Sequence, residues 1–569
     1  MDMWPPVSES PKRHELCFGC VGFPEEIYTM AFFLRSPALI SGLLVAILSL
    51  PVADPLPAAE SAPAGAFSQS VAVASAGDEA MAEFYRARGY APLWTGEGER
   101  FRARRQALFD SLGRAALHGL PVARHDTAEL LAQMRDARDI RDLGAVEVAL
   151  SRAFLRYARD LQSGILVPRQ IDSGLVREVA RPDPLVLLRG FATAESAAGF
   201  LAALAPATAE YRALMKARLD LETAIAAGGW GSGVPGGPTL RPGESGERVI
   251  ALRNRLVAMG YMKRSASPTY DAALQEAVQR FQDRHGLAAD GIAGPVTVTE
   301  VNVPMEQRLK SVLVALERER WLNMDRGERH ILVNMTDYTT RIVDHGEVTF
   351  ETRSVIGMNA DGRRSPEFSD EMSHMVVNPT WYVPRSIVTQ EYLPQLRRNP
   401  YAVSHLVITD SSGRQIDRRA VDFTQYTARN FPFSMREPPS QRNALGQVKF
   451  MFPNKYNIYL HDTPSKSLFN HDARAFSHGC IRLADPVDFA KALLAPQTDD
   501  PEGLFRSTLN TGRETRINIE PPVPVHLIYR TAFTDGRGSL EFRRDVYGRD
   551  ARIWEALARA GVALPEVRG

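Results

Sequence analysis

The stretch HDTPSKSLFNHDARAFSHGCIRL, which runs from His461 to Leu483, holds three histidines, two aspartates and one cysteine among mostly small, polar and basic residues. Side chains of these types ligate metal ions or carry out nucleophilic catalysis in proteins. The stretch begins at the end of NIYL (457–460), a short apolar run that is typical of a β-strand. Its first histidine is therefore predicted to lie at the end of a strand, where a side chain can be held rigidly.

A mostly β region surrounds this stretch. In HILVNM, Ile331, Val333 and Met335 alternate onto one face of a predicted strand. MVVNPTWYVP has similar character, and QVKFMF and NIYLHD are predicted to form a pair joined at residues 453–455. We predict a mainly β domain over residues 329–496.

An Arg- and Pro-containing insertion at about 387–443 interrupts the β pattern. An insertion of that length inside a β domain is usually a lid or a binding loop, or else it is disordered. We expect a lid.

A metal site is one interpretation of the opening stretch. His461, His471, His478 and Cys480 are all zinc-ligand types, but His478 and Cys480 form the single closely spaced pair and no second cysteine is near. The spacing argues against zinc, so no metal is predicted. A second alternative is a solvated loop whose cysteine has no role.

A nucleophilic cysteine explains more of these residues. A thiol with an ordinary pKa of about 8.5 needs a cation, a base or oriented N–H groups to react at neutral pH. His461 is the predicted base, and Gly479 lets the backbone approach a substrate closely. The N–H groups of His478, Gly479 and Cys480 are expected to face one oxyanion. Covalent acyl transfer follows, with either water or an amine resolving the thioester.

The rest of the chain is predicted to form further units. Residues 78–227 have helical spacing, and a Gly/Pro-rich linker separates them from two short amphipathic helices within 240–303. The apolar faces of these two helices comprise Val249, Leu252, Leu256 and Met259, then Leu274, Val278 and Phe281. Residues 497–569 are predicted to form a C-terminal extension with a hairpin at Asp535-Gly536 and a short helix.

The N-terminus carries a predicted export signal over residues 30–64. Arg35 precedes an apolar run from Ala38 to Leu50 and a Pro/Ala/Ser-rich stretch, an order typical of a signal peptide. The run is short for a spanning helix, which needs roughly 20 apolar residues, although an uncleaved signal anchor in the inner membrane is an alternative. Residues 1–29 are predicted to be a non-functional extension.

Two compositional features narrow the function. Lys and Arg total 68 and Asp and Glu total 67, so no global basic field points to nucleic acid. Cys17 and Cys20 precede the apolar run, which leaves Cys480 alone in the exported part of the chain. A lone cysteine there cannot form an internal disulfide, so it is either inert or kept for its reactivity.

Several motifs resemble known families. His461, fifteen residues and then Ser-His-Gly-Cys ending at Cys480 resemble the signature of the YkuD-type L,D-transpeptidase catalytic domain. GERVIALRNRLVAMGYM and AVQRFQDRHGLAADGIAGPVT resemble a peptidoglycan-binding domain. With the helical region, the insertion and the terminal FRRDVYGRD, the exported chain is similar to large YcbB-like members of Gram-negative bacteria. That resemblance implies a multidomain α+β fold: a helical scaffold domain, a small helical peptidoglycan-binding domain and a mainly β catalytic domain with an inserted lid.

The resemblance also implies roles for residues. Cys480 corresponds to the family's nucleophile and His461 to its general base and acid, while Ser477, His478 and Gly479 fall on the SHGC positions. The position of Arg482 is often Asn in smaller members. Its guanidinium could hold a substrate carboxylate or brace the loop.

Two further residues are substrate-binding candidates. Trp381 could line the groove or belong to the core, and Asp462 could orient the imidazole through its side chain or its backbone. Because adjacent strand residues point to opposite faces, contact through the side chain is the weaker option.

The resemblance implies a periplasmic enzyme without cofactors, acting on peptidoglycan stem tetrapeptides and binding wall glycan. Cys480 would attack the L-centre carbonyl at position three, release the terminal D-Ala and pass the acyl group to an amine on another stem. Carbapenems would acylate the same thiol. An L,D-carboxypeptidase or amidase that uses water as acceptor is the main alternative, and a non-catalytic wall-binding scaffold is a third.

Overall fold

The computed structural model describes residues 65–535 and 538–565. The predicted N-terminal extension and export signal lie outside the described residues. In the part of the chain that the structure describes, no helix combines the length and the apolar character that a membrane span requires.

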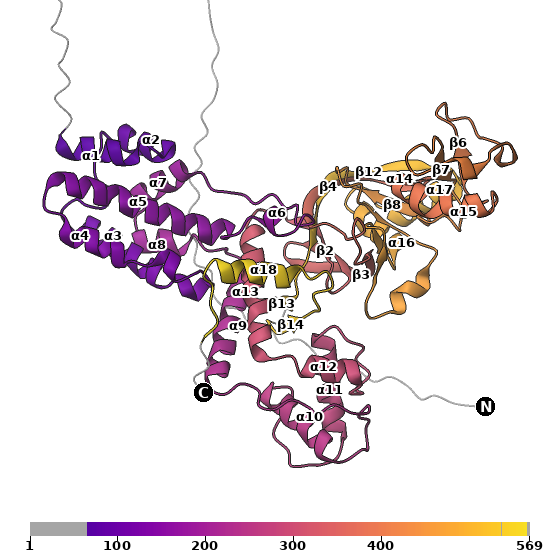
Figure 1. Ribbon diagram of the computed structural model, residues 1–569, viewed down its shortest axis with the longest axis horizontal. Helices are drawn as coiled ribbons and strands as arrows, with labels where there is room; N and C mark the ends of the chain where they lie inside the picture. Colours follow the sequence, from indigo (N-terminus) through magenta and orange to yellow (C-terminus); the bar gives the residue numbers. More distant parts are fainter. Residues whose placement is uncertain (1–64, 536–537, 566–569) are drawn as a thin grey trace, which may run out of the picture. The chain divides into compact units, whose positions relative to one another are not determined.

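Helices build the N-terminal part of the described chain, as the sequence predicted (Figure 1). The longest, α5 (Ile140–Ser163), is capped at its N-terminus by Asp139, whose carboxylate accepts hydrogen bonds from the N–H groups of Arg141 and Asp142. Apolar side chains of α5, such as Phe154 and Leu161, are buried in the core of this region. The other helices here are α1 (Ala66–Ser75), α2 (Glu79–Ala87), α3 (Glu99–Gly113), α4 (Ala128–Asp136), α6 (Pro168–Ile171), α7 (Pro184–Thr193), α8 (Ala197–Ala202) and α9 (Ala209–Ala226).

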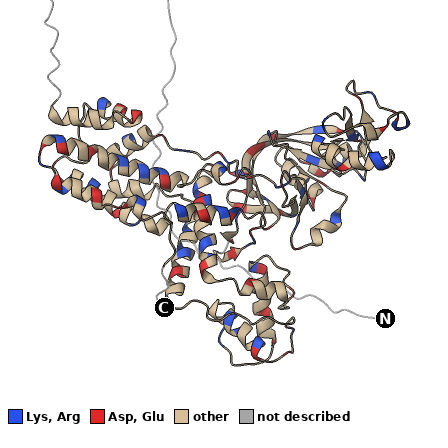
Figure 2. Cartoon of the chain, viewed as in Figure 1, with Lys and Arg blue, Asp and Glu red and all other residues tan. Residues whose placement is uncertain are grey.

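Lys and Arg are intermixed with Asp and Glu along the two longest of these helices, α5 and α9. Figure 2 shows the two signs intermixed on α5 and α9, in keeping with the near balance of charge in the whole sequence.

A small helical module follows, as predicted. Val249, Leu252 and Leu256 of α10 (Glu247–Ala258) share one core with Leu274, Val278 and Phe281 of α11 (Ala272–Arg284). The module ends with α12 (Pro295–Val301), which begins with proline at its first helical position.

A long buried helix, α13 (Met305–Trp321), leads from this module to the sheet. It packs against α9 and against the C-terminal helix α18 (Arg549–Arg559), so segments far apart in sequence meet along it (Figure 1).

Nine strands form the main sheet of the mostly β region, in the order β10-β3-β11-β9-β8-β4-β12-β1-β2. A further pairing of β2 with β3 closes all of these strands except β10 into a ring, which removes most free edges. Ile331 and Val333 of β1 are fully buried inside, as their alternation predicted. The strands are β1 (Arg329–Asn334), β2 (Thr339–Asp344), β3 (Glu347–Gly357), β4 (Phe368–Val377), β8 (Val448–Met451), β9 (Leu460–His461), β10 (Ala475–Ser477), β11 (Ile481–Leu483) and β12 (Thr515–Ile528).

The C-terminal region is not an appendage to this domain, which differs from the division predicted at residue 497. Strand β12 lies between β4 and β1, so the chain after residue 497 completes the sheet. Helices α16 (Pro486–Leu494) and α17 (Pro501–Asn510) precede β12. The predicted hairpin pairs β13 (Ala532–Thr534) with β14 (Leu540–Phe542), and α18 follows.

The insertion is an ordered subdomain with its own core, which includes Leu396, Ile408, Phe423 and Met435. Its three-stranded sheet has the order β5-β7-β6 and begins at Trp381, earlier than the predicted boundary at 387. The elements are β5 (Trp381–Tyr382), α14 (Arg385–Ile387), the π-helix η3 (Val388–Tyr392), α15 (Leu393–Arg398), β6 (Val407–Thr409), the short helices η4 (Arg418–Ala420) and η5 (Phe423–Gln425), and β7 (Ser434–Glu437).

Candidate active site

Two short neighbouring strands carry the main candidate residues. Strands β9 and β11 run parallel, and His461 lies in register with Arg482. Since side chains alternate along a strand, Tyr459 shares the face of His461 and Cys480 shares the face of Arg482. All four line one cavity of about 1010 Å³.

The insertion supplies one wall of this cavity. Trp381 and Tyr382 of β5 and Glu391 and Tyr392 of η3 are among its lining residues. Trp381 also packs on the core of the insertion, with its ring edge-on to Tyr392 at 6.4 Å between centroids. Trp381 therefore lines the cavity and also packs against the core of the insertion, so both of the positions considered for it apply.

His461 is 4% exposed, and its ring is fixed by its neighbour's backbone. The Nδ1 atom donates a hydrogen bond to the carbonyl oxygen of Asp462 at 2.5 Å. Because a carbonyl can only accept, Nδ1 carries the proton and Nε2 is left as an acceptor. Burial, assisted by the charge of Arg482, lowers the pKa of His461 to about 3. The imidazole is thus neutral and able to accept a proton.

The Asp462 side chain lies on the other face of the strand. Its carboxylate accepts hydrogen bonds from the N–H groups of Gln447 at 2.9 Å and Thr463 at 2.6 Å, and from Lys466 Nζ at 2.8 Å. The carboxylate therefore braces the turn after β9, and the contact of Asp462 with the imidazole runs through its backbone carbonyl.

Cys480 is a free, half-buried thiol. Its Sγ donates to the carbonyl oxygen of Asn457 at 3.6 Å. Burial raises the pKa of Cys480 to about 11, against opposing hydrogen bonds from Tyr459 and the positive charge of Arg482. The resting pair is therefore a thiol and a neutral imidazole, so reaction requires proton transfer to a base.

Hydrogen bonds of the Ser477 side chain stabilise the turn formed by Ser477, His478 and Gly479. The Ser477 Oγ donates to the carbonyl oxygen of Cys480 at 2.5 Å and accepts from the N–H of Gly479 at 3.1 Å. The N–H of Gly479 is therefore engaged within the turn, which differs from the expectation that three N–H groups face one oxyanion. For the N–H groups of His478 and Cys480, the described residues provide no acceptor.

The His478 side chain turns toward the insertion. Its Nε2 contacts the Glu391 carboxylate at 2.6 Å, and Arg363 reaches the same carboxylate at 2.7 Å. Glu391 was not predicted from the sequence, because nothing local in the insertion marks it. Tyr459 was also missed, although its position two residues before His461 would have placed it on the same face.

Arg482 carries a charge without a protein partner in the described residues. No hydrogen bond or ion pair joins its guanidinium to them, and its Nε atom is buried without an acceptor. Its interactions there are electrostatic, with Cys480 and His461. The guanidinium therefore does not brace the loop by hydrogen bonds, and it could bind an anion in the cavity.

His471 lies outside this arrangement. It is exposed, and its ring packs edge-on against Phe476 at 5.2 Å. Among the described residues, no group of three or more His, Cys, Asp or Glu side chains has the geometry to hold a metal ion.

Comparison with known families identifies the parts of the chain. Residues 328–519 match the YkuD model, described as "L,D-transpeptidase catalytic domain". The chain carries a YkuD-type L,D-transpeptidase catalytic domain. Residues 245–300 match a "Putative peptidoglycan binding domain" and residues 79–217 a "Scaffold domain". The transpeptidase domain thus follows two helical domains, as the resemblance implied.

Individual relatives match parts of the chain. It is 32% identical over 225 residues to "Putative L,D-transpeptidase" of Haemophilus influenzae, and this alignment covers 39% of the present chain and 45% of that protein. It is 38% identical over 125 residues to "Zinc D-Ala-D-Ala carboxypeptidase" of Streptomyces albus G, covering 21% of this chain and 45% of that protein. The chain thus spans less than half the length of these relatives. A crystal structure of L,D-transpeptidase (Yku) from Stackebrandtia nassauensis aligns with 52% of this chain and 97% of its own at 15% identity and a TM-score of 0.21.

Proposed function

We propose that this protein is an exported cysteine L,D-transpeptidase that cross-links peptidoglycan stem peptides in the periplasm of a Gram-negative bacterium. One observation carries the proposal: the Cys480 thiol and the neutral, tautomer-fixed His461 lie on one face of adjacent strands and line the same large cavity. They do so inside the L,D-transpeptidase catalytic domain.

The protonation states define the first step of the proposed mechanism. His461 Nε2 takes the Sγ proton while Sγ attacks the carbonyl carbon of the third residue of a tetrapeptide donor. The tetrahedral oxyanion then collapses, the bond to the D-Ala nitrogen breaks, and the imidazolium returns its proton to that nitrogen. A thioester on Cys480 and free D-Ala result.

The second step mirrors the first. A side-chain amine of another stem attacks the thioester carbon and loses its proton to His461. The carbon–sulfur bond then breaks, and Cys480 recovers its proton. The product is a cross-linked dimer, whereas attack by water would give a tripeptide monomer and make the enzyme an L,D-carboxypeptidase.

Arg482 is proposed to bind a substrate carboxylate. Its guanidinium lines the cavity, lies beside His461 in register and lacks a counter-charge among the described residues. A bidentate pair with a carboxylate would satisfy the guanidinium and orient the donor peptide. Trp381 lines the same cavity from the insertion and is proposed to contact the rest of the stem peptide. The peptidoglycan-binding domain would keep the chain near wall glycan.

The test is mass spectrometry of products from purified tetrapeptide muropeptides. Wild-type protein should give cross-linked dimers, free D-Ala and a transient acyl adduct on the Cys480 peptide. Tripeptide monomers alone would replace the transpeptidase proposal with the carboxypeptidase.

The matched control is Cys480→Ala, which should abolish both products and still bind wall sacculi. Unchanged products from this variant would exclude Cys480 as the nucleophile. Loss of sacculus binding would instead indicate a folding defect.

A further inference from the structure

Ser365 lies beneath the catalytic turn and joins two backbone segments. It is fully buried, and its Oγ donates to the carbonyl oxygen of Gly479 at 2.6 Å and accepts from the N–H of Gly357 at 2.9 Å. Gly357 is the last residue of β3, where an added Cβ would lie 2.1 Å from the carbonyl oxygen of Arg363. The strand end and the loop holding Ser365 are therefore in close contact.

The bond to Gly479 fixes a peptide plane next to the nucleophile. In a trans peptide, the carbonyl oxygen of one residue and the N–H of the next point in opposite directions. Since the Gly479 carbonyl points down to Ser365, the N–H of Cys480 must point to the other side of the turn. Cys480 itself lines the cavity, and no described residue accepts a hydrogen bond from that N–H.

We propose that Ser365 is a positioning residue, which holds the Gly479–Cys480 peptide so that the Cys480 N–H donates to the reaction's oxyanion. This inference rests on the proposed acyl-transfer function. Gly479 has a φ of +120°, which glycine adopts readily because it lacks a side chain. The same conformational freedom means that a hydrogen bond from a neighbouring segment is needed to hold the turn in one orientation. The Ser365 hydroxyl supplies that hydrogen bond from the buried side.

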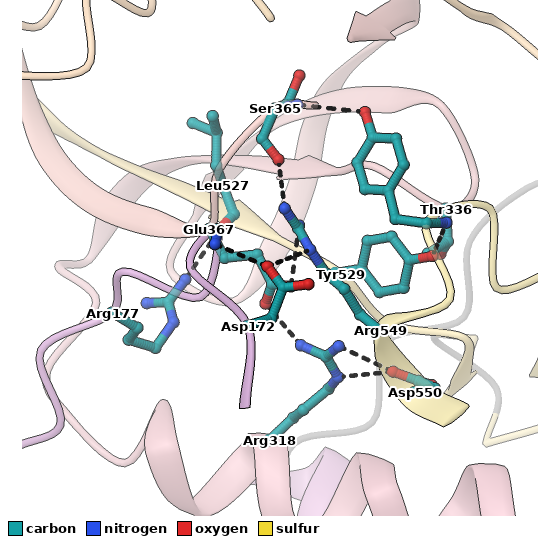
Figure 3. A network of polar contacts seen from close by, with 12 residues as sticks. Asp172, Arg177, Arg318, Thr336, Ser365, Glu367, Leu527, Tyr529, Arg549 and Asp550 are labelled. Atoms are coloured by element: carbon teal, nitrogen blue, oxygen red, sulfur yellow. Dashed lines mark hydrogen bonds and ion pairs between the residues drawn. The ribbon is translucent and has the colours of Figure 1, made fainter. Parts of the chain in front are cut away.

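Ser365 is itself held by the C-terminal segment (Figure 3). Arg549 donates to the carbonyl oxygen of Ser365 at 2.9 Å, and the N–H of Ser365 donates to the Tyr547 hydroxyl at 3.3 Å. That hydroxyl donates in turn to the carbonyl oxygen of Gly357 at 2.6 Å. Both polar backbone groups of Ser365 are therefore satisfied by residues of the FRRDVYGRD segment.

A buried ionic network fixes Arg549 in turn. Glu367 accepts from Arg549 at 3.1 Å and from Arg318 of α13 at 2.6 Å, and Arg318 also donates to Asp550 at 2.8 Å. Figure 3 shows Arg549 between Ser365 on one side and Glu367 on the other. The terminal segment thus acts on the active site by way of Ser365, at a distance from the substrate.

The experiment compares two reactions of the same thiol in Ser365→Ala. Acylation by a carbapenem opens the β-lactam carbon–nitrogen bond through an oxyanion, whereas iodoacetamide alkylates Sγ by displacing iodide and forms none. Loss of one oxyanion donor slows acyl transfer by roughly 100- to 1000-fold. In Ser365→Ala the Cys480 N–H is displaced and not removed, so acylation should slow by about 10- to 100-fold. Alkylation should stay within about twofold of wild type. For the muropeptide donor, kcat should fall while KM stays nearly unchanged.

Ser354→Ala is the matched control, because Ser354 is also fully buried but bonds to Thr340 Oγ1 and not to the turn. It should leave both rates unchanged. If Ser365→Ala fails to fold, Arg549→Lys replaces it in the experiment. This variant keeps the positive charge but weakens the hydrogen bond to the Ser365 carbonyl oxygen, and it must slow acylation more than alkylation. Wild-type acylation rates in the folded variant, or equal slowing of both reactions, would overturn the inference alone. If neither the carbapenem nor the tetrapeptide donor acylates the wild-type protein, the proposed function and this inference are overturned together.

Discussion

The cavity around Cys480 and the buried network around Glu367 both contain arginine side chains, but the two regions hold these charges in opposite ways. In the network, Arg318 and Arg549 are both paired with the carboxylate of Glu367, and these three side chains are almost fully buried. In the cavity, Arg482 has no carboxylate partner among the described residues, and Cys480 and His461 are both uncharged at neutral pH.

The difference indicates what each region is for. A buried charge without a partner is strongly unfavourable, so pairing in the network serves to hold α13, α18 and the loop before β4 in one arrangement. An unpaired guanidinium at the wall of an open cavity is tolerated because solvent reaches it, and it gains most when a substrate carboxylate arrives. Paired charges thus maintain the fold, whereas the unpaired charge of Arg482 is the one that we propose for substrate binding.

The largest expected effect concerns the uncharged pair in the cavity. With the pKa of Cys480 near 11 and that of His461 near 3, no stable thiolate–imidazolium pair forms at neutral pH. The thiolate fraction should rise about tenfold per pH unit, so alkylation of Cys480 by iodoacetamide should accelerate about ten-thousandfold from about pH 5 to about pH 9. Peptide mass mapping separates Cys480 from the other cysteines. A plateau above about pH 6 would show that a charged pair already exists.

Breaking the network should have the next largest effect. Glu367→Gln leaves Arg318 and Arg549 without their shared carboxylate, and removal of one partner from a buried pair costs about 3 to 5 kcal/mol in the free energy of unfolding. Urea unfolding followed by circular dichroism measures this loss. Glu351→Gln, which breaks the half-exposed pair with Arg341, is the control and should cost at most about 1 kcal/mol. Equal losses in the two variants would contradict the structural role of the network.

Arg482 allows a test of the unpaired charge. Arg482→Lys keeps the charge but loses the bidentate geometry, and we expect kcat/KM for the tetrapeptide donor to fall about 10- to 100-fold. The control is a donor whose terminal carboxylate is converted to an amide. On that donor the wild type and the variant should be nearly equal if this carboxylate is the partner. An undiminished gap between them would place the Arg482 partner elsewhere.

Local patterns predicted much of the fold and the centre of the site. Alternation at Ile331 and Val333 predicted a strand, helical spacing predicted α10 and α11, and the spacing from His461 to Cys480 pointed to nucleophile chemistry. These signals depend on neighbours within one turn or one strand, or on a motif that folds as a unit.

Non-local contacts could not be predicted in this way. Strand β12 pairs with β4 and β1 from more than a hundred residues away in sequence, and no local feature of β12 encodes its partners. Likewise, Ser365 stands in an ordinary loop sequence, and its role depends on meeting Gly479 across the fold. Glu391 could not be identified because its partner, His478, lies in another part of the chain.

Glu391 gives the smallest expected effect, since it belongs to the cavity wall yet is paired like the network. It accepts from Arg363 and contacts His478, and all three side chains are about one-third exposed. Solvent screens such pairs, so Glu391→Gln should change the free energy of unfolding by only about 0 to 1 kcal/mol. The same contacts join the insertion to the catalytic turn, so KM for the donor should rise a few-fold, more so at low salt, where the wild-type contact is strongest. Glu351→Gln serves again as the control and should leave KM unchanged. A stability loss as large as that of Glu367→Gln would show that this wall belongs with the buried network and not with the cavity.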